Sequence, residues 1–349
     1  MAAPALRFPA EWEPQSAVLL AWPHAGTDWA ARLDDVETTY VALVAAIARF
    51  QNVVVCVADD GLRQHVAQKL AEAGVPVANV RYVQVEYDDT WLRDSGPLTL
   101  LPSADASPNN PGVLLDFKFN AWGDKFASAR DDQLVEALFA QALFHNAQRT
   151  RIEFTLEGGS VETDGNGTLL STWLCLHKRH PGLDREKLSA KLCEYLHQKR
   201  VLWMDFGYLQ GDDTDAHVDT LARFASPTSI LYQGCDDQLD CHFEELRAMA
   251  IELAGMRTLD DQPYKLLGLP WARPILDGRR RLAASYANFL IINGAVLMPT
   301  YDDPADARAA AVLAEAFPGR EIVPVPCRPL IWQNGSLHCL TMQLPAGVL

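Results

Sequence analysis

Residues 212–220 read DDTDAHVDT, so four aspartates and one histidine occupy nine consecutive positions. Carboxylates at this density repel one another unless a cation lies against them. Three explanations are open: a solvated acidic loop, a metal site, or a pocket for a positively charged substrate.

The spacing within this stretch fits neither of two common metal motifs. An EF-hand calcium loop needs glycine at its sixth position and glutamate at its twelfth, but counting from Asp213 these positions hold Val218 and Phe224. A zinc site through His217 lacks a second histidine or cysteine at helical spacing. We therefore expect no metal ligands here.

His217 and Asp219 remain as a pair that could do chemistry. In an extended segment, residues two apart project from the same face, so an imidazole and a carboxylate would line one pocket as general acid/base and charge anchor. Asp212 and Asp215 are better explained as turn or capping groups.

Two earlier loops carry further carboxylates. Asp94 lies in WLRDSGP, where it is either a turn aspartate or a group pointing into a pocket, and Trp91 is either a core aromatic or a wall of that pocket. Glu157 opens EGGS, whose two glycines form an ordinary turn or permit close approach of a ligand.

A cysteine in the last polar loop completes the set. Cys339 lies in NGSLHCLT and is either a buried, inert thiol or a nucleophile whose pKa is lowered by a cation. The neighbouring His338 would face the opposite way in a strand, so we do not pair it with Cys339. Together, carboxylates that bind a planar cation, a histidine that moves protons and a cysteine that attacks carbon point to a guanidinium substrate.

The surrounding sequence predicts how these loops are positioned. Four segments each read as a helix followed by a short strand and then one of the polar loops. If these units are equivalent, their loops gather at the strand ends, where α/β proteins usually bind ligands. The predicted helices and strands are 61–74 with 80–87, 131–144 with 150–156, 183–198 with 200–206, and 303–317 with 321–326. A polar loop without regular structure is predicted at 101–112.

Composition narrows the class of protein. The 349-residue chain has a net charge of -15, which argues against nucleic acid as a partner, because binding phosphates needs a basic face. No apolar run is long enough for a membrane span, and the start lacks the pattern of a secretory signal. The seven cysteines are scattered without a CxxC motif, so we expect a reduced, cytoplasmic protein without a structural zinc site.

At these residues the sequence resembles the agmatine deiminase family, which is grouped with the bacterial-type peptidylarginine deiminases. The resemblance runs in order over residues 8–345, nearly the whole chain. The matching segments are FPAEWEPQSAVLLAWPH, DTWLRDSGP, FNAWG, LEGGSVETDGNGTLLST, GDDTDAHVDTLARF, YANFLIINGAVLMPTYDDP and GSLHC.

The resemblance implies a single α/β domain over residues 1–349, a five-bladed propeller of pseudo-symmetric ββαβ units around a central active site. It also implies hydrolysis of a small cationic guanidine without a cofactor or metal, most simply of agmatine in polyamine and putrescine biosynthesis. The roles that it implies are Cys339 as nucleophile, His217 as general acid/base, Glu157 as the residue that orients His217, Asp94 and Asp219 as the guanidinium clamp, and Trp91 as an aromatic wall.

Three departures from the agmatine-specific pattern bear on the substrate. Those relatives usually have a triple glycine and Asn-Ile before His-Cys, and Asp-Gly-His where this chain has Asp215-Ala216-His217; the segment DKFASARDDQ also differs from their glycine-rich version. Alternatives therefore stay open: a deiminase of peptidyl-arginine or another small guanidine, an amidinotransferase, a non-catalytic polyamine or guanidine binder, or a metallohydrolase. The sequence also leaves open the oligomeric state, with a homodimer as one alternative.

Overall fold

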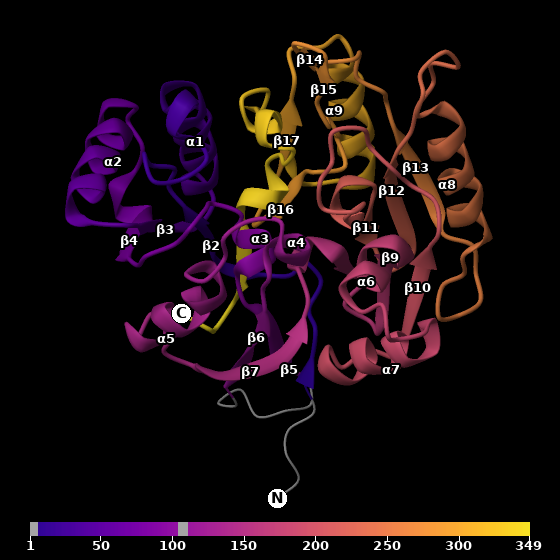
Figure 1. Cartoon of the computed structure of the whole chain (residues 1–349), viewed down its shortest axis with the longest axis horizontal. Helices are drawn as coiled ribbons and strands as arrows, with labels where there is room; N and C mark the ends of the chain where they lie inside the picture. Colours follow the sequence, from indigo (N-terminus) through magenta and orange to yellow (C-terminus); the bar gives the residue numbers. More distant parts are fainter. Residues whose placement is uncertain (1–5, 104–110) are drawn as a thin grey trace, which may run out of the picture. The chain divides into compact units, whose positions relative to one another are not determined.

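The computed structural model describes residues 6–103 and 111–349 and has a mixed α/β fold built on several small sheets (Figure 1). The chain divides into two compact units. Unit 1 comprises Met1–Gly158 and Cys339–Leu349, and unit 2 comprises Gly159–His338.

Unit 1 contains two four-stranded sheets, with strand orders β19-β2-β3-β4 and β1-β5-β6-β7. Their strands are β1 (Leu6–Arg7), β2 (Gln15–Ala21), β3 (Asn52–Val57), β4 (Val80–Gln84), β5 (Leu98–Pro102), β6 (Gly112–Lys118), β7 (Ala147–Thr155) and β19 (Met342–Pro345). The helices are α1 (Leu33–Ala48), α2 (Asp60–Glu72), α3 (Leu92–Ser95), α4 (Ala121–Asp124) and α5 (Leu134–Ala140), with 3-10 turns η1 (Ala30–Arg32), η2 (Val77–Asn79) and η3 (Asp131–Gln133).

Unit 2 contains three three-stranded sheets and one two-stranded ribbon. Their strands are β8 (Val161–Thr163), β9 (Thr168–Thr172), β10 (Arg200–Met204), β11 (Ala222–Ser226), β12 (Ser229–Gln233), β13 (Lys265–Leu269), β14 (Leu276–Asp277), β15 (Arg280–Arg281), β16 (Leu290–Ile292), β17 (Ala295–Thr300) and β18 (Glu321–Pro326). The helices are α6 (Trp173–Arg179), α7 (Arg185–Tyr195), α8 (Phe243–Gly255) and α9 (Ala305–Ala316), with 3-10 turns η5 (Val218–Thr220) and η6 (Leu330–Gln333); η4 (Gly158–Ser160) and η7 (His338–Leu340) lie where the chain passes between units.

One connection recurs in both units. A strand pairs antiparallel with the next, and a helical crossover then leads to a third strand parallel to the second, as parallel pairing requires. The elements of this connection are β5-β6-α5-β7 in unit 1, and β8-β9-α7-β10, β11-β12-α8-β13 and β16-β17-α9-β18 in unit 2. In the remaining sheet, β19 takes the antiparallel place beside β2.

The middle strands form the core, whereas the last strand of each repeat is an edge. All five residues of β9 are buried, as expected for a strand covered on both faces. By contrast, β18 alternates buried and exposed residues and contains Pro324 and Pro326, which suit an edge because proline cannot donate a ladder hydrogen bond. The polar loops that follow these edge strands carry the predicted site residues.

The predicted helix–strand units are confirmed with small boundary shifts. The strand predicted at 321–326 coincides with β18, and the helix predicted at 303–317 contains α9. The repeat that contains α8 was missing from the prediction. The loop predicted at 101–112 falls mainly on residues 104–110, which lie outside the described residues. Among the helices of the described residues, none is long and apolar enough to cross a bilayer.

Candidate functional site

Asp94 is an interior residue of unit 1, in the single helical turn α3 that follows β4. Its side chain is only 4% exposed, and its Oδ2 accepts the indole N–H of Trp122 at 2.9 Å. Trp91, directly before α3, is also buried. Because its carboxylate bonds a side chain from another loop, Asp94 does more than close a local turn.

The loop that brings Trp122 to Asp94 has an unusual backbone. Four consecutive residues have positive φ: Ala121 at 45°, Trp122 at 59°, Gly123 at 94° and Asp124 at 62°. This region is disfavoured for residues with a Cβ atom, so neighbouring groups must hold the loop in place. The Asn120 side chain accepts the Gly123 N–H at 3.1 Å.

Two adjacent aspartates anchor the backbones of both loops. Asp131 Oδ1 accepts the N–H of Asp88 at 2.8 Å, just before the segment that carries Trp91. Asp132 Oδ1 accepts the N–H of Phe119 at 2.6 Å, just before the loop that carries Trp122. Burial raises the pKa of Asp131 to about 7, although the backbone donors partly oppose this rise.

The EGGS segment packs closely against α3. Glu157 is completely buried, and a Cβ atom on Gly158 would lie 2.1 Å from the backbone oxygen of Arg93. Real Cβ atoms do not approach this closely, so the position requires glycine. The glycines of this segment therefore permit close packing of two backbones, and Glu157 is held at that contact.

Met342 of β19 joins three segments of unit 1. Arg93 Nη1 lies 3.8 Å from Met342 Sδ, and a Cβ atom on Gly96 or Gly158 would lie 3.2 Å from the methionine side chain. These contacts gather the chain segments that carry the predicted residues of this unit: Asp94, Glu157 and Cys339.

Cys339 lies in η7 and is 5% exposed. The expectation that residues 338–339 form a strand is wrong, because the chain makes a 3-10 turn here before β19 begins. Burial strongly raises the pKa of two other cysteine thiols, those of Cys56 and Cys327. Those two thiols stay protonated and are unsuited to nucleophilic chemistry.

His217 and Asp219 are both buried in unit 2, but not in the predicted extended segment. Residues 218–220 form the 3-10 turn η5 instead. Thr220 imposes this turn, because its N–H and its Oγ1 both donate to the carbonyl oxygen of His217, at 3.3 and 2.9 Å. The two side chains are therefore brought together by a turn and not by strand alternation.

Asp219 belongs to a buried polar network. His338 Nδ1 lies 2.8 Å from Asp219 Oδ2, and the Asn288 amide donates to the same oxygen at 3.3 Å. Asn288 also accepts the backbone N–H of His338 at 2.9 Å. Burial alone would raise the pKa of Asp219, but the His338 hydrogen bond and the charges of His338, His217 and Arg223 outweigh it and hold that pKa below its usual value.

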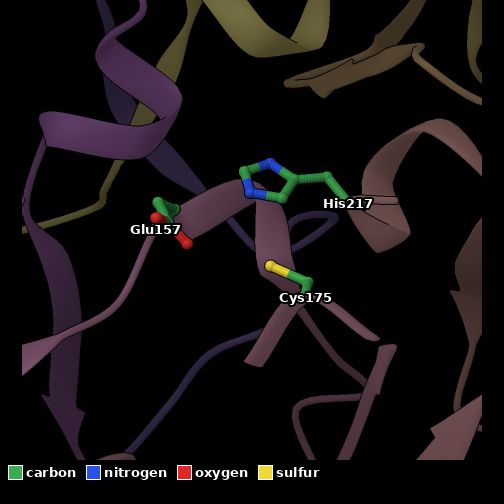
Figure 2. A group of neighbouring side chains, drawn as sticks. All are labelled: Glu157, Cys175 and His217. Carbon is green, nitrogen blue, oxygen red and sulfur yellow. The ribbon is translucent and has the colours of Figure 1, made fainter. Parts of the chain in front are cut away.

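A second thiol lies beside His217. Figure 2 shows Cys175 and His217 of unit 2, with Glu157 of unit 1 also labelled. The sulfur of Cys175 and a ring nitrogen of His217 are within 4.8 Å of each other. Cys175 is completely buried on α6, so this helix forms part of the surroundings of the imidazole.

Three neighbouring side chains that could bind a metal ion already form hydrogen bonds with other groups. Potential ligand atoms of Asp240, Cys241 and His242 lie within 4.8 Å of one another. His242 Nδ1 lies 2.7 Å from Asp240 Oδ1, while its Nε2 accepts the Gln210 N–H at 2.7 Å. Arg281 also donates to Asp240, so the group is better described as a hydrogen-bonded polar network than as a ligand set.

Sequence reasoning missed four residues that contact the predicted ones. Trp122 bonds Asp94, His338 and Asn288 bond Asp219, and Cys175 lies beside His217. Trp122 and Asn288 lie in the segments FNAWG and YANF, whose resemblance to a known family singled them out without assigning a role. His338 was set aside because a strand was expected.

The sequence and the structure both match known proteins. Residues 7–345 match the family described as Porphyromonas-type peptidyl-arginine deiminase. An agmatine deiminase of Pseudomonas aeruginosa is 34% identical, over 97% of this chain and 95% of that protein.

Solved structures agree over nearly the full length. A cysteine-to-serine variant of C. jejuni agmatine deiminase, with substrate bound, has a TM-score of 0.89 at 31% identity and covers 100% of this chain and 99% of that one. A provisionally named arginine deiminase from Porphyromonas gingivalis has a TM-score of 0.89 at 44% identity and covers 99% of this chain and 100% of that one.

Proposed function

Because the chain belongs to the Porphyromonas-type peptidyl-arginine deiminase family, we propose that it hydrolyses a guanidinium group, converting agmatine and water to N-carbamoylputrescine and ammonia. This product leads towards putrescine. The proposal uses no cofactor and no metal ion.

The observation that carries the proposal is the burial of two carboxylates, Asp94 and Asp219, which are 4% and 0% exposed. Trp122 donates to one oxygen of Asp94, and His338 lies 2.8 Å from one oxygen of Asp219; a buried carboxylate is stabilised further by added hydrogen-bond donors and by a cation. A guanidinium supplies both, because its planar N–H groups can bond two carboxylate oxygens at once. Asp219, whose pKa is held low, remains ionised for this purpose.

In the first half of the reaction, the Cys339 thiolate adds to the guanidinium carbon and forms a tetrahedral intermediate. His217 gives a proton to the departing nitrogen, so the carbon–nitrogen bond breaks and ammonia leaves. Cys339 is then covalently bound as an S-alkylthiouronium.

In the second half, His217 takes a proton from water, and the resulting hydroxide attacks the same carbon. The carbon–sulfur bond breaks, Cys339 departs as a thiolate, and the former water oxygen gives up its remaining proton to solvent. The ureido group is neutral and no longer balances the charge of Asp94 and Asp219, which favours release of the product.

Two further residues complete the proposed site. Glu157 is assigned to orient His217 and to stabilise its protonated form. Trp91 is assigned as an aromatic wall beside the guanidinium, whose planar cation can stack on an indole ring.

The recurrent strand–strand–helix–strand connection supports a further proposal, that residues 1–349 form one domain with five pseudo-symmetric blades around a central site. We place the protein in the cytoplasm, since no disulfide joins any of its seven cysteines.

One alternative substrate has a specific observation behind it: another guanidine compound, such as free arginine or peptidyl arginine. Ala216 stands where the family resemblance implies glycine in the agmatine-specific members. The P. gingivalis protein named an arginine deiminase is also more identical to this chain than the agmatine deiminases described above. The deimination chemistry would be the same, and only the contacts to the far end of the substrate would differ.

The deciding experiment measures ammonia release from agmatine by chelator-treated protein, with mass spectrometry of the product. We expect a ureido product from the wild type and none from Cys339→Ser. Cys241→Ser is the matched control, because Cys241 is exposed and has no proposed role, so it should match the wild type. Arginine and an arginine-containing peptide are assayed in parallel to identify the substrate.

Other outcomes would select a rival. Agmatine that binds unchanged, with equal affinity in Cys339→Ser, would indicate a non-catalytic binder. Transfer of the amidino group to an added amine would indicate an amidinotransferase. Activity lost with chelator and restored by a divalent metal would indicate a metallohydrolase. Full activity in Cys339→Ser would refute the nucleophile assignment.

A further inference from the structure

The turn before His217 carries backbone strain. Asp215 and Ala216 are consecutive residues with positive φ, at 67° and 69°. A residue with a Cβ atom is disfavoured in this region, and such a conformation persists only where its surroundings enforce it. The groups that enforce this turn therefore also determine how His217 enters the interior of unit 2.

One set of restraints lies within the turn itself. Asp212 Oδ2 accepts the N–H of Ala216 at 2.7 Å, and Asp212 Oδ1 accepts the Thr214 hydroxyl at 2.6 Å. That hydroxyl oxygen in turn accepts the N–H of His217 at 3.2 Å. The prediction that Asp212 shapes this loop is confirmed.

A second set of restraints comes from α6 and the residue before it. Arg179 Nη1 donates to Asp215 Oδ2 at 2.7 Å, and its Nη2 donates to the Thr214 carbonyl oxygen at 3.0 Å. Thr172 Oγ1 donates to the Ala216 carbonyl oxygen at 2.7 Å. These bonds reach three successive residues of the turn, so the turn is held against α6 along its length.

The buried arginine dominates this contact. Both Arg179 and its neighbour Lys178 pair with Asp215, but the Arg179 side chain is 2% exposed and the Lys178 side chain is 52% exposed. An exposed ion pair contributes little, because water and salt screen it. A buried guanidinium with two directed hydrogen bonds fixes both distance and orientation.

The same helix also carries a side chain close to the imidazole. The sulfur of Cys175 on α6 is within 4.8 Å of a ring nitrogen of His217. Figure 2 labels both side chains. A shift of α6 relative to the turn would therefore move both the backbone that carries His217 and a group that packs against its ring.

We propose that Arg179 is a positioning residue for His217. By joining Asp215 and the Thr214 carbonyl to α6, it holds the strained turn and keeps the imidazole oriented for proton transfer. This inference rests on the proposed role of His217 as general acid/base. It gives Arg179 no contact with substrate, so its loss should affect turnover and not binding.

The test compares Arg179→Met with Lys178→Met, two neighbouring cations that share Asp215. We expect Arg179→Met to lower kcat at least tenfold with KM within threefold of wild type. Lys178→Met should stay within twofold in both constants. Equal kcat values in the two variants, or a rise in KM as large as the fall in kcat, would overturn the proposal.

A conservative variant and a second readout keep the test decisive. Arg179→Lys retains the positive charge but cannot make both directed bonds, so we expect its kcat to lie between those of Arg179→Met and the wild type. If kcat were no higher than in Arg179→Met, the charge of Arg179 would not help to hold the turn, which would contradict the proposal. If Arg179→Met does not fold, Arg179→Lys takes its place in the comparison.

Amide hydrogen exchange of residues 212–218 tests the inference without any substrate. It should accelerate at least tenfold in Arg179→Met and remain as in wild type in Lys178→Met. Absence of all guanidine hydrolysis in the wild type would refute the proposed function. Unchanged exchange in Arg179→Met would refute the positioning role independently.

Discussion

Trp122 donates its indole N–H to Asp94 Oδ2 at 2.9 Å, and both residues are buried in unit 1. The indole is fixed by a loop of four positive-φ residues, which Asn120 and Asp132 hold through backbone hydrogen bonds. The hydrogen bond from Trp122 thus holds one oxygen of Asp94 in a fixed orientation. A carboxylate oriented in this way can meet a planar cation without rearranging.

Removal of that donor should impair the clamp. Trp122→Phe keeps an aromatic ring but leaves Asp94 without the indole N–H, and a hydrogen bond to a charged group contributes roughly 1.5–3 kcal/mol. We expect kcat/KM for the guanidine substrate to fall about tenfold or more.

Trp271→Phe is the matched control for this variant. The Trp271 indole also donates to an aspartate, Asp240, at 2.9 Å, but Asp240 has no proposed role in the reaction. We expect kcat/KM of Trp271→Phe to stay within twofold of wild type. Equal losses in the two variants would show that the effect is a general one of losing a buried indole donor.

His338 should set the acid limit of activity. Its hydrogen bond to Asp219 helps to hold the carboxyl pKa below its usual value against the effect of burial. In His338→Phe burial is no longer opposed by this bond, so the pKa of Asp219 rises. Since the ionised form binds the cation, the acid limb of kcat/KM against pH should move to higher pH in His338→Phe.

Stability should change in the same direction. A carboxyl group with a depressed folded-state pKa stabilises the fold above its unfolded pKa, and this contribution is lost as pH falls through the folded value. As the pH is lowered, His338→Phe should therefore begin to lose this contribution to stability at a higher pH than the wild type does. His65→Phe removes a histidine–carboxylate contact of the same length, 2.8 Å from Glu37 but with a half-exposed histidine, and should leave the acid limb in place.

The repeat of helix and strand was predictable, whereas the contacts that orient the site were not. The strand at Glu321–Pro326 follows from an alternating pattern bounded by a helix, and such patterns are local. The contact between Arg179 and Asp215 spans 36 positions, and that between Trp122 and Asp94 spans 28. No periodicity encodes pairs of this kind, because they depend on how separate segments pack.

The conformation around His217 and His338 shows a second limit. Both were assigned to extended backbone from short polar stretches, but His217 directly precedes the 3-10 turn η5 and His338 is the first residue of η7. At His217 the turn depends on Thr220, whose hydroxyl bonds the His217 carbonyl oxygen. Side-chain to backbone bonds of this type compete with strand pairing and override local propensity.

Asp131 should make the stability of the protein depend on pH near neutrality. Its folded pKa is raised by burial to about 7, above the value of an unfolded chain, so its stabilising effect is complete at low pH and is lost as pH rises through about 7. Asp89, raised in the same way to about 7, lies close by and acts in the same direction.

Asp131→Asn removes the titration but retains an oxygen that can accept the Asp88 N–H. We expect the free energy of unfolding of the wild type to fall between pH 5 and 8. The free energy of unfolding of Asp131→Asn should fall less, and the two slopes should differ by about 1.4 kcal/mol for each pH unit over which Asp131 titrates. Denaturant titrations across this range provide the measurement. Asp236→Asn, at an exposed ion pair with Arg308, controls for loss of one charge, and a slope equal to that of Asp131→Asn would contradict the assignment.

Gly158 should tolerate no side chain. A Cβ atom there would lie 2.1 Å from the backbone oxygen of Arg93, and a backbone atom cannot move aside as a flexible side chain can. Gly158→Ala must therefore separate the EGGS segment from α3, which displaces Glu157 and Asp94 together. We expect a loss of about 2–4 kcal/mol in the free energy of unfolding, measured by denaturant titration, together with loss of guanidine hydrolysis. Gly182→Ala is the matched control, because nothing lies within 4 Å of the added atom, and it should match wild type in both measurements. If Gly158→Ala were as stable and active as Gly182→Ala, the close packing of these two backbones would not be what holds Glu157 beside α3.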